Sequence, residues 1–448
     1  MCTQLFAADL RRLMRQLRIG SHGKHESRLL RLPVEILQQI FSYLKPSSLV
    51  RICLVCHQLR CIATPSLFRT VTLDSDQGFG FMVAITRKPE HALYVHSMTI
   101  HDHSSHIPDY HEIYTGYATF LEDAILRCTN LRNLTIKASN IRDTLPDYTS
   151  DHEFELTARE DSFQRIFLSP LQPSCLASLE ICELNLSDAE GWNLAEREGI
   201  FFHPRLKRLS ILGAIIPDIA SFDKSHKHTS PLEELSLMGC DISPKALEKI
   251  ALVPKRLRHF TFIAQPQGMY GSKENTSVRH KLYFKCLLPQ AASLEFLNVS
   301  IWKRLHSDNP PIDFRPFSAL QHLTIQPGIL QGNGEDFYNL TQFSFNPLPA
   351  SLKHLTLFDV RLIFLPRMEE SYVGSLAQWI AEGSLPNFAS LTFANPLDRP
   401  EELKLPSGWE ESFQGKVVVK REQFVKLRRF PIDCDCCEYN MGSWELRF

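Results

Sequence analysis

The chain of 448 residues is long enough for one large elongated domain or for two to three compact ones. Hydrophobic residues make up 44% of it and charged residues 22%, the balance of a soluble globular protein. The formal net charge of −1 provides no general attraction to nucleic acid or to an anionic membrane, so neither is expected as a partner. No run of about 18 uncharged apolar residues is present, so no membrane-spanning helix is expected.

Residues 1–28 begin with MCTQLFAADLRRLMRQLRIG, a basic amphipathic segment. A mitochondrial presequence has a similar pattern, but Asp9 and the scarcity of serine favour a plain docking or frayed helix. The segment lacks a clean apolar stretch with a cleavage site, so secretion is not expected. The twelve cysteines are scattered and several stand in apolar runs, as reduced thiols of intracellular proteins do. We therefore expect a cytoplasmic or nuclear protein.

Residues 29–66 carry the pattern of three short helices, beginning with LPVEILQQIFSYL. Pro33 and Glu35 suit the first turn of the first helix, because proline needs no N–H there and an acidic residue complements the helix dipole. The Lys45-Pro46 step ends this helix, since a residue before proline is pushed out of the helical region.

A second helix is expected after a cap at Ser47 or Ser48, and a third is expected from Val55 to Pro65. Three helices of this size bury too little core to stand alone, and apolar residues occupy more than one face of each. One face is therefore expected to pack internally while another meets a partner. An ordinary helical cap on the following domain would show the same periodicity.

The three-helix segment resembles the F-box, whose pattern is roughly Leu-Pro-x-Glu-Ile/Leu-x-x-x-Ile-Phe-x-x-Leu followed by a Leu-x-x-x-x-x-Val-Cys helix. The residues that match it are Leu32, Pro33, Glu35, Ile36, Ile40, Phe41, Leu44, Leu49, Val55, Cys56 and Arg60. Ser48 and Leu59 stand where Asp and Trp are common, but both keep the helical spacing. The resemblance implies docking onto the Skp adaptor of a cullin–RING ubiquitin ligase. The residues that it implies for adaptor binding are Leu32, Pro33, Glu35, Ile36, Ile40, Phe41, Leu44, Leu49, Val50, Leu54, Val55, Cys56 and Leu59.

From Phe68 onward a six-residue pattern, apolar-x-x-apolar-x-apolar, recurs at intervals of about 25 to 45 residues. Its copies are FRTVTL at 68, VHSMTI at 95, LRNLTI at 131, LASLEI at 176, LKRLSI at 206, LEELSL at 232, LRHFTF at 257, LEFLNV at 294, LQHLTI at 320, LKHLTL at 352 and FASLTF at 388. Such spacing indicates leucine-rich-repeat-like units, each a short strand with a return segment.

Helical patterns at 117–128, 243–252 and 372–383 favour parallel pairing of the strands between them. The predicted fold class is therefore α/β. The F-box-like segment leads into a curved solenoid over residues 67–430, with strands on the concave face and helices on the convex face, and a tail follows over 431–448.

Alternation along the strands predicts two columns of side chains on the concave face. One is rich in hydroxyls, which suit neighbouring strands. It reads Thr72, Thr99, Thr135, Glu180, Ser210, Ser236, Thr261, Asn298, Thr324, Thr356 and Thr392. The preceding column varies in charge and size, as a shaped protein-binding surface or an unconstrained exposed surface would. It reads Ser97, Asn133, Ser178, Arg208, Glu234, His259, Phe296, His322, His354 and Ser390.

Irregular repeats behind an F-box-like segment resemble fungal F-box proteins with degenerate leucine-rich repeats. This resemblance implies a substrate-recognition subunit without catalytic residues of its own or a cofactor. Because recognition concentrates in a few central residues, the predicted substrate-binding positions are the central ones of the varied column. They are Arg208, Glu234, His259, Phe296, His322 and His354. A non-catalytic scaffold outside a ubiquitin ligase would use the same surfaces and is the alternative.

Metal and catalytic motifs are weak or missing. The segment HDHSSHIPDYH and the cysteines of CDCC lack a complete set of zinc ligands at the usual spacing, so a solvated loop and unliganded thiols are favoured. The residues concerned are His101, His103, His106, His111, Cys434, Cys436 and Cys437. No phosphate-binding loop, nucleophile elbow or RING-like array is present. Residues 140–161 form an acidic insertion, and a second insertion begins at Gly268.

Overall fold

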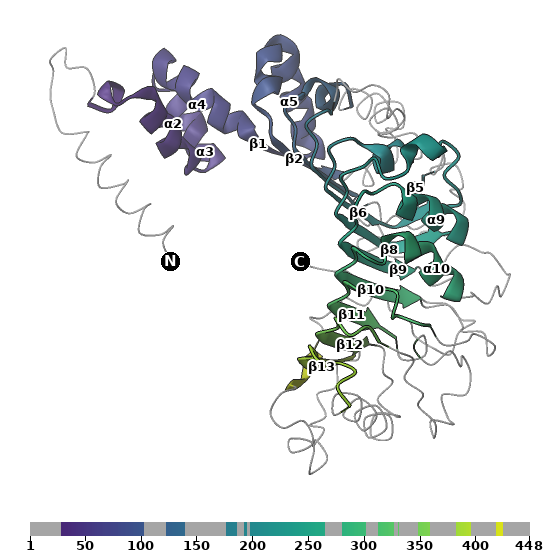
Figure 1. Cartoon of the computed structure of the whole chain (residues 1–448). Helices are drawn as coiled ribbons and strands as arrows, with labels where there is room; N and C mark the ends of the chain where they lie inside the picture. The colour runs from purple at the N-terminus through teal and green to yellow at the C-terminus, as the bar shows by residue number, and fades with distance from the viewer. Residues whose placement is uncertain are drawn as a thin grey trace, which may run out of the picture.

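Two separate apolar cores organise the chain. One lies within the N-terminal helices, and the other covers one face of a long parallel sheet. Figure 1 shows the helices at one end of an arc whose body is the sheet. The computed structural model describes residues 28–102, 122–138, 176–185, 192–194, 198–264, 280–301, 312–326, 330, 348–358, 382–395 and 418–423.

Three α-helices follow the short 3-10 helix η1 (Arg28–Arg31) and enclose the first core. They are α2 (Val34–Ser42), α3 (Pro46–Cys53) and α4 (His57–Arg69). The buried side chains at the centre are Leu37, Phe41, Leu49, Leu59, Ile62 and Ala63. So small a core stabilises little by itself, so the contact of these helices with the next part of the chain matters.

The start of α3 differs from its prediction. The helix begins at Pro46 with Lys45 as its N-cap, and no side chain caps it. Neither Ser47 nor Ser48 therefore plays the predicted capping part, because Pro46 already occupies the first helical position that its fixed φ angle suits.

The end of α4 also differs from its prediction, because the helix passes through Pro65 and continues to Arg69. Leu67 packs against the first core and Phe68 against the second. Partial burial of these two large apolar side chains offsets the loss of the backbone hydrogen bond that proline cannot make. The next element starts at Thr70, so one helix joins the two cores without a linker.

Twelve strands of the described residues pair in parallel and in chain order, which confirms the predicted α/β class with a parallel sheet. They are β1 (Thr70–Asp74), β2 (Ser97–Asp102), β3 (Asn133–Ala138), β4 (Ile181–Asn185), β6 (Arg208–Leu212), β8 (Glu234–Ile242), β9 (His259–Ala264), β10 (Phe296–Ile301), β11 (His322–Ile325), β12 (His354–Phe358), β13 (Ser390–Asn395) and β14 (Val418–Gln423). The short strands β5 (Trp192–Asn193) and β7 (Ala214–Ile216) form a side branch next to β8.

Helical return segments pack against the second core. They are α5 (Ser75–Arg87), η2 (Pro89–Tyr94), η6 (Glu198–Phe202), η7 (Lys224–His226), α9 (Pro244–Leu252), α10 (His280–Leu287) and η8 (Leu288–Gln290). Figure 1 shows α9 and α10 on the outer side of the arc and the strands on its inner side. α9 is the helix predicted over 243–252, with the Ser243 hydroxyl accepting from the N–H of Ala246 at 3.0 Å as its N-cap. Residues 122–127, within the helix predicted over 117–128, are helical too.

The register of the sheet aligns the predicted hydroxyl column from strand to strand. Thr72 pairs with Thr99 near one edge, and Thr356 pairs with Thr392 near the other. Along β6 the burial alternates, so that Leu209 faces the core while its neighbours face away. We call the side of the sheet opposite the core its inner face.

One strand is shifted by three residues from its predicted position. β4 spans Ile181–Asn185, so Glu183 and not Glu180 stands in the hydroxyl column. Likewise Ile181 and not Ser178 stands in the varied column. The motif LEICEL fits the apolar pattern as well as the overlapping LASLEI, and LEICEL is the copy whose three apolar landmarks the core buries.

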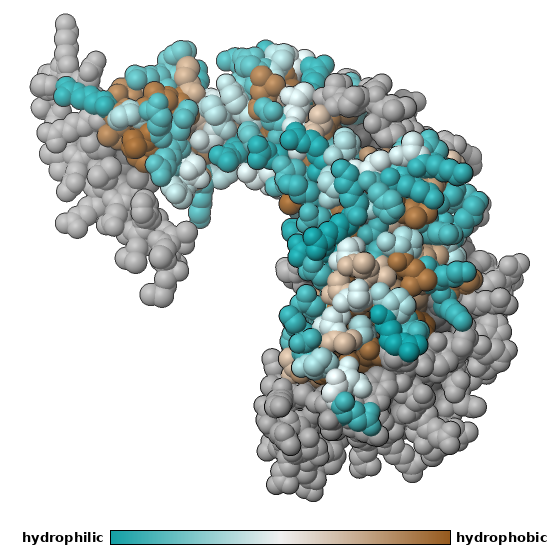
Figure 2. Space-filling view, in the orientation of Figure 1, coloured by the Kyte–Doolittle hydropathy of each residue, from teal (hydrophilic) through white to brown (hydrophobic). Residues whose placement is uncertain are grey.

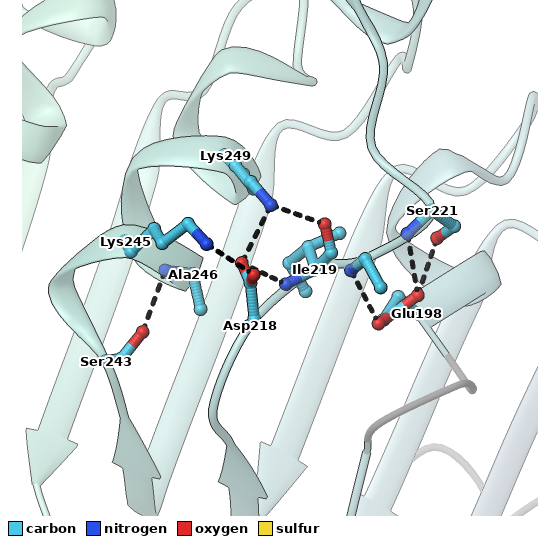
Figure 3. Close-up of polar contacts among 9 residues, drawn as sticks. Glu198, Asp218, Ile219, Ser221, Ser243, Lys245, Ala246 and Lys249 are labelled. Atoms are coloured by element: carbon cyan, nitrogen blue, oxygen red, sulfur yellow. Dashed lines mark hydrogen bonds and ion pairs between the residues drawn. The ribbon is translucent and has the colours of Figure 1, made fainter.

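A buried carboxylate fixes the loop that follows β7 (Figure 3). Glu198 of η6 is 3% exposed, and its carboxylate accepts the N–H groups of Ala220 and Ser221 at 2.9 and 3.4 Å. It also accepts the Ser221 hydroxyl at 2.6 Å. These hydrogen bonds satisfy a charge that would otherwise be costly to bury.

An ion-pair cluster ties the same loop to α9 (Figure 3). The Asp218 carboxylate accepts Lys245 at 2.7 Å and Lys249 at 2.8 Å. Lys249 also donates to the Ile219 carbonyl at 2.8 Å. The hydrogen bonds from the two ammonium groups hold the pKa of Asp218 well below its usual value of 3.8.

Asp218→Asn should lower the free energy of unfolding by about 0.5–1 kcal/mol at pH 7, because the cluster is partly open to solvent. A depressed pKa stabilises the fold fully above the unfolded-state value and ceases to do so as the pH falls through the folded-state value. Urea unfolding of the two proteins should therefore differ at pH 7, and the difference should shrink steadily as the pH falls below the usual value of 3.8. A difference that stays constant across this window would assign the effect to packing instead of charge.

A buried amide connects three successive segments of the second core. Gln290 of η8 is 2% exposed, and its side-chain nitrogen donates to the carbonyls of Ala251 and Pro254, both at 2.9 Å. Its side-chain oxygen accepts the N–H of Leu257 at 2.9 Å. The amide thus satisfies backbone groups where the chain leaves α9 and approaches β9.

Several sequence predictions lie outside the described residues. They concern the N-terminal segment to residue 27, His103, His106, His111, the acidic insertion 140–161, residues 268–279, most of the helix predicted over 372–383, and the tail with Cys434, Cys436 and Cys437.

Candidate interaction surfaces

The N-terminal helices expose large apolar side chains that their own core does not use. Six of the nine exposed large hydrophobic residues among the described ones lie between positions 34 and 55. Figure 2 shows hydrophobic residues gathered over this end of the molecule. We call these six the exposed apolar surface: Val34, Ile36, Tyr43, Val50, Leu54 and Val55. Such a concentration of exposed apolar residues on a small unit is typical of interaction surfaces.

Exposure divides the residues predicted for adaptor binding into three groups. Pro33, Glu35, Ile36, Val50, Leu54 and Val55 are exposed. Leu32, Ile40, Leu44 and Cys56 are partly buried against the first core. Phe41, Leu49 and Leu59 are buried within it. The last group fills the core and leaves no side-chain surface to a partner, so its part in the F-box-like pattern is to hold the helices together.

Two exposed residues, Val34 and Tyr43, are absent from the predicted set. Helical periodicity could not find them, because apolar residues stand on more than one face of these helices. Only the packing of α2 on α4 shows which face is left open.

Two residues of the pattern stabilise the turn between α3 and α4. The Cys56 sulfur accepts the N–H of Leu59 at 3.5 Å and caps α4. The Arg60 side chain donates to the Cys53 carbonyl at 2.9 Å, which satisfies a carbonyl at the end of α3. The pattern thus combines residues that build the fold with residues that form its surface.

The six residues predicted for substrate binding stand on adjacent strands in one register. We call this row the inner ladder: Arg208, Glu234, His259, Phe296, His322 and His354. All of them lie on the inner face and are exposed or half-buried. The structure therefore brings the predicted residues together, while what they bind stays a prediction.

The first half of the inner ladder is an ion-pair cluster. Arg208 contacts the Glu234 carboxylate through two nitrogens, at 2.6 and 3.1 Å. His259 lies 3.7 Å from the same carboxylate. These charges largely neutralise one another.

The second half of the inner ladder is a run of rings in contact. The His259 and Phe296 centroids are 6.0 Å apart, and those of Phe296 and His322 are 6.1 Å apart. His322 and His354 stack at 4.5 Å, and His354 Nδ1 lies 2.7 Å from the Ser390 hydroxyl. The planes of neighbouring rings meet at 68° for His259 and Phe296, at 37° for Phe296 and His322, and at 19° for His322 and His354, so the strip runs from an edge-on pair to a stacked pair.

Backbone hydrogen bonds before each strand fix this row. The Glu295 carbonyl accepts the N–H groups of both Gln321 and His322, at 2.8 and 3.0 Å. The Gln321 carbonyl accepts those of Lys353 and His354 in the same way, at 2.8 and 2.9 Å. Repetition of this arrangement holds each ladder residue beside its neighbour.

Desolvation and the positive charges of His354, Lys353 and His259 lower the pKa of His322 below its usual value of 6.5. His322 is therefore mostly neutral at pH 7 in the free protein. An anion placed beside it would favour the protonated ring.

Two features are absent from the described ranges. No helix there is long and apolar enough to cross a membrane. In the same part of the chain, no group of three or more His, Cys, Asp or Glu side chains is placed to hold a metal ion.

Comparison with protein families matches residues 29–74 to the F-box-like domain. The match covers α2, α3 and α4 and extends into β1, and it confirms the F-box resemblance. No curated protein matches the chain.

An F-box-like domain points to an adaptor that binds a Skp subunit within a Skp–cullin–F-box type complex. Proteins with this domain are in general non-catalytic adaptors. The chain thus carries an F-box-like domain joined directly to a long parallel sheet.

Proposed function

We propose that this protein is the substrate-recognition subunit of a Skp–cullin–F-box ubiquitin ligase. The exposed apolar surface docks on the Skp adaptor, and the inner face of the sheet holds a protein substrate. The observation that carries the proposal is the placement of two distinct open surfaces on one chain, apolar on the F-box-like helices and polar-aromatic on the sheet.

The junction between the two surfaces supports their separate roles in adaptor docking and substrate binding. Phe68 packs on the second core, and its ring lies 4.5 Å from that of His91 in η2. The Arg69 carbonyl accepts the N–H of His96 at 3.0 Å. A junction without a linker holds a bound substrate at a set place relative to the adaptor, which raises its effective concentration at the ligase.

The repeat type, domain limits and cell compartment belong to the same proposal. We assign the strand and return units to a leucine-rich-repeat-like solenoid over residues 67–430, of the kind found in fungal F-box proteins. The support is the regular register of strands with apolar landmarks before and within them. The F-box spans residues 29–66, and the protein acts in the cytoplasm, the nucleus or both.

The proposal is tested by purifying the tagged full-length chain from cells and detecting the Skp adaptor and a cullin in the eluate. We expect both, in a complex that survives 150 mM salt because the docking surface is apolar. Absence of the adaptor would overturn the proposal. Capture of the adaptor without a cullin would favour the alternative, a scaffold that acts outside a ligase.

A further inference from the structure

The second half of the inner ladder offers donors without partners. Neither ring nitrogen of His322 has a hydrogen-bond partner among the described residues, and His354 uses only Nδ1. Lys353, directly before His354, makes no ion pair within the described ranges. The next column on the same face adds two half-buried hydroxyls, those of Thr324 and Thr356.

The charges around these donors are unbalanced. The groups that act on the charge of His322 are Lys353, which is positive, and His259 and His354, which are positive only when protonated. Glu295, directly before the neighbouring strand β10, is already paired with Arg258 at 2.8 Å and lies 3.5 Å from Arg256. Glu234 on β8 is paired with Arg208. No uncompensated carboxylate therefore faces His322 and His354 from the described strands β8 to β13.

We propose that the inner face from Phe296 to Ser390 binds an acidic, carboxylate-bearing segment of a protein partner. This rests on the proposed function and names the chemical class of its substrate. An extended acidic segment lying across β10 to β13 would place carboxylates against His322, His354 and Lys353. Its apolar atoms would meet the Phe296 ring.

Binding should be coupled to proton uptake. A carboxylate beside an imidazole raises its pKa, so affinity is greatest below the pKa of the free ring and falls as the pH rises through the pKa in the complex. Because the pKa of free His322 lies below 6.5, the change in affinity should begin below pH 6.5 and continue upward to the raised pKa of the ring in the complex. If binding raises the pKa of one histidine by one, the affinity changes about tenfold across that pH range.

The test measures fluorescence anisotropy of a labelled ten-residue polyglutamate peptide with the full-length protein. We expect the peptide to bind about five- to tenfold tighter at pH 6.0 than at pH 7.5. The double variant His322→Gln and His354→Gln should lose most of this pH dependence and bind at least about fivefold more weakly at pH 6.0. His57→Gln, a matched change of an exposed histidine in α4, should bind like the natural chain.

Polylysine, polyglutamine and an oligothymidylate of equal length complete the experiment. Equal binding of polyglutamine, preferential binding of polylysine or oligothymidylate, or unchanged polyglutamate binding by the double variant would overturn the proposal. The double variant should still capture the Skp adaptor, because its changes lie far along the chain from α2 to α4. Failure of acidic-peptide binding is thus separable from failure of the proposed function.

Discussion

A variant carrying Leu54→Asp and Val55→Asp should fold like the natural chain and fail to capture the Skp adaptor. These side chains are 73% and 70% exposed, so the free protein loses little packing when they change. In a complex each aspartate would bring an unpaired charge into an apolar contact, which costs several kcal/mol. Affinity should fall by at least about a hundredfold, to below detection in a co-purification.

The matched control replaces two exposed leucines on the sheet side of the molecule, Leu93→Asp and Leu282→Asp, which are 49% and 43% exposed. It should capture the adaptor normally. Circular dichroism and melting should agree for all three proteins. Capture by the Leu54 and Val55 variant at the level of the control would place the docking surface elsewhere on the chain.

The burial of each residue explains why this variant separates loss of docking from loss of folding better than one designed from the F-box pattern alone. Leu32 belongs to the pattern but packs on the first core, so its loss would disturb the fold as well as the surface. Substitutions within that core would separate the two effects even less; the residues concerned are Phe41, Leu49 and Leu59. A family pattern records which residues are needed without saying whether they build the fold or contact the partner.

The parallel sheet and its register could be predicted because each strand contributes one residue to each column. The apolar positions of the repeated pattern then set which residues of adjacent strands lie side by side. This is why His259, Phe296 and His322 could be placed next to one another from sequence. The same rule failed at β4, where two overlapping copies of the pattern competed and only burial decides between them.

The contacts within the inner ladder lay beyond sequence reasoning. Register predicts that His322 and His354 are neighbours, but it does not tell whether their rings stack or turn away from each other. It also could not show that Glu295 is already paired with Arg258, so that within the described strands no free carboxylate is left for His322 and His354. The charge balance of the site depends on these side-chain choices.

The burial of Gln290 could not be predicted from the sequence, because a polar residue in a turn is usually exposed. Its neighbours in LLPQAAS give no sign that the core closes over it. The partners that make burial tolerable are the backbone groups of Ala251, Pro254 and Leu257, more than thirty residues away in the chain.

Gln290→Leu should therefore destabilise the sheet by about 3 kcal/mol, although leucine is more hydrophobic and similar in size. The change removes two donated hydrogen bonds and leaves the N–H of Leu257 without an acceptor in a buried site. Each buried backbone group without a partner costs about 1–3 kcal/mol, while the gain in apolar burial is smaller. Urea unfolding followed by circular dichroism should show the loss as a lower midpoint.

The reverse exchange in the same turn provides the control. Leu288 lies two positions earlier in η8 and is 43% exposed, so Leu288→Gln should change the free energy of unfolding by no more than about 0.5 kcal/mol.

Ser293→Ala is an intermediate case, because the Ser293 hydroxyl donates to the Leu257 carbonyl at 2.8 Å in the same network. It should cost about 1 kcal/mol. Gln290→Leu at or above natural stability would mean that apolar burial outweighs the hydrogen bonds at this point, and the amide would then have no structural part in joining α9 to β9.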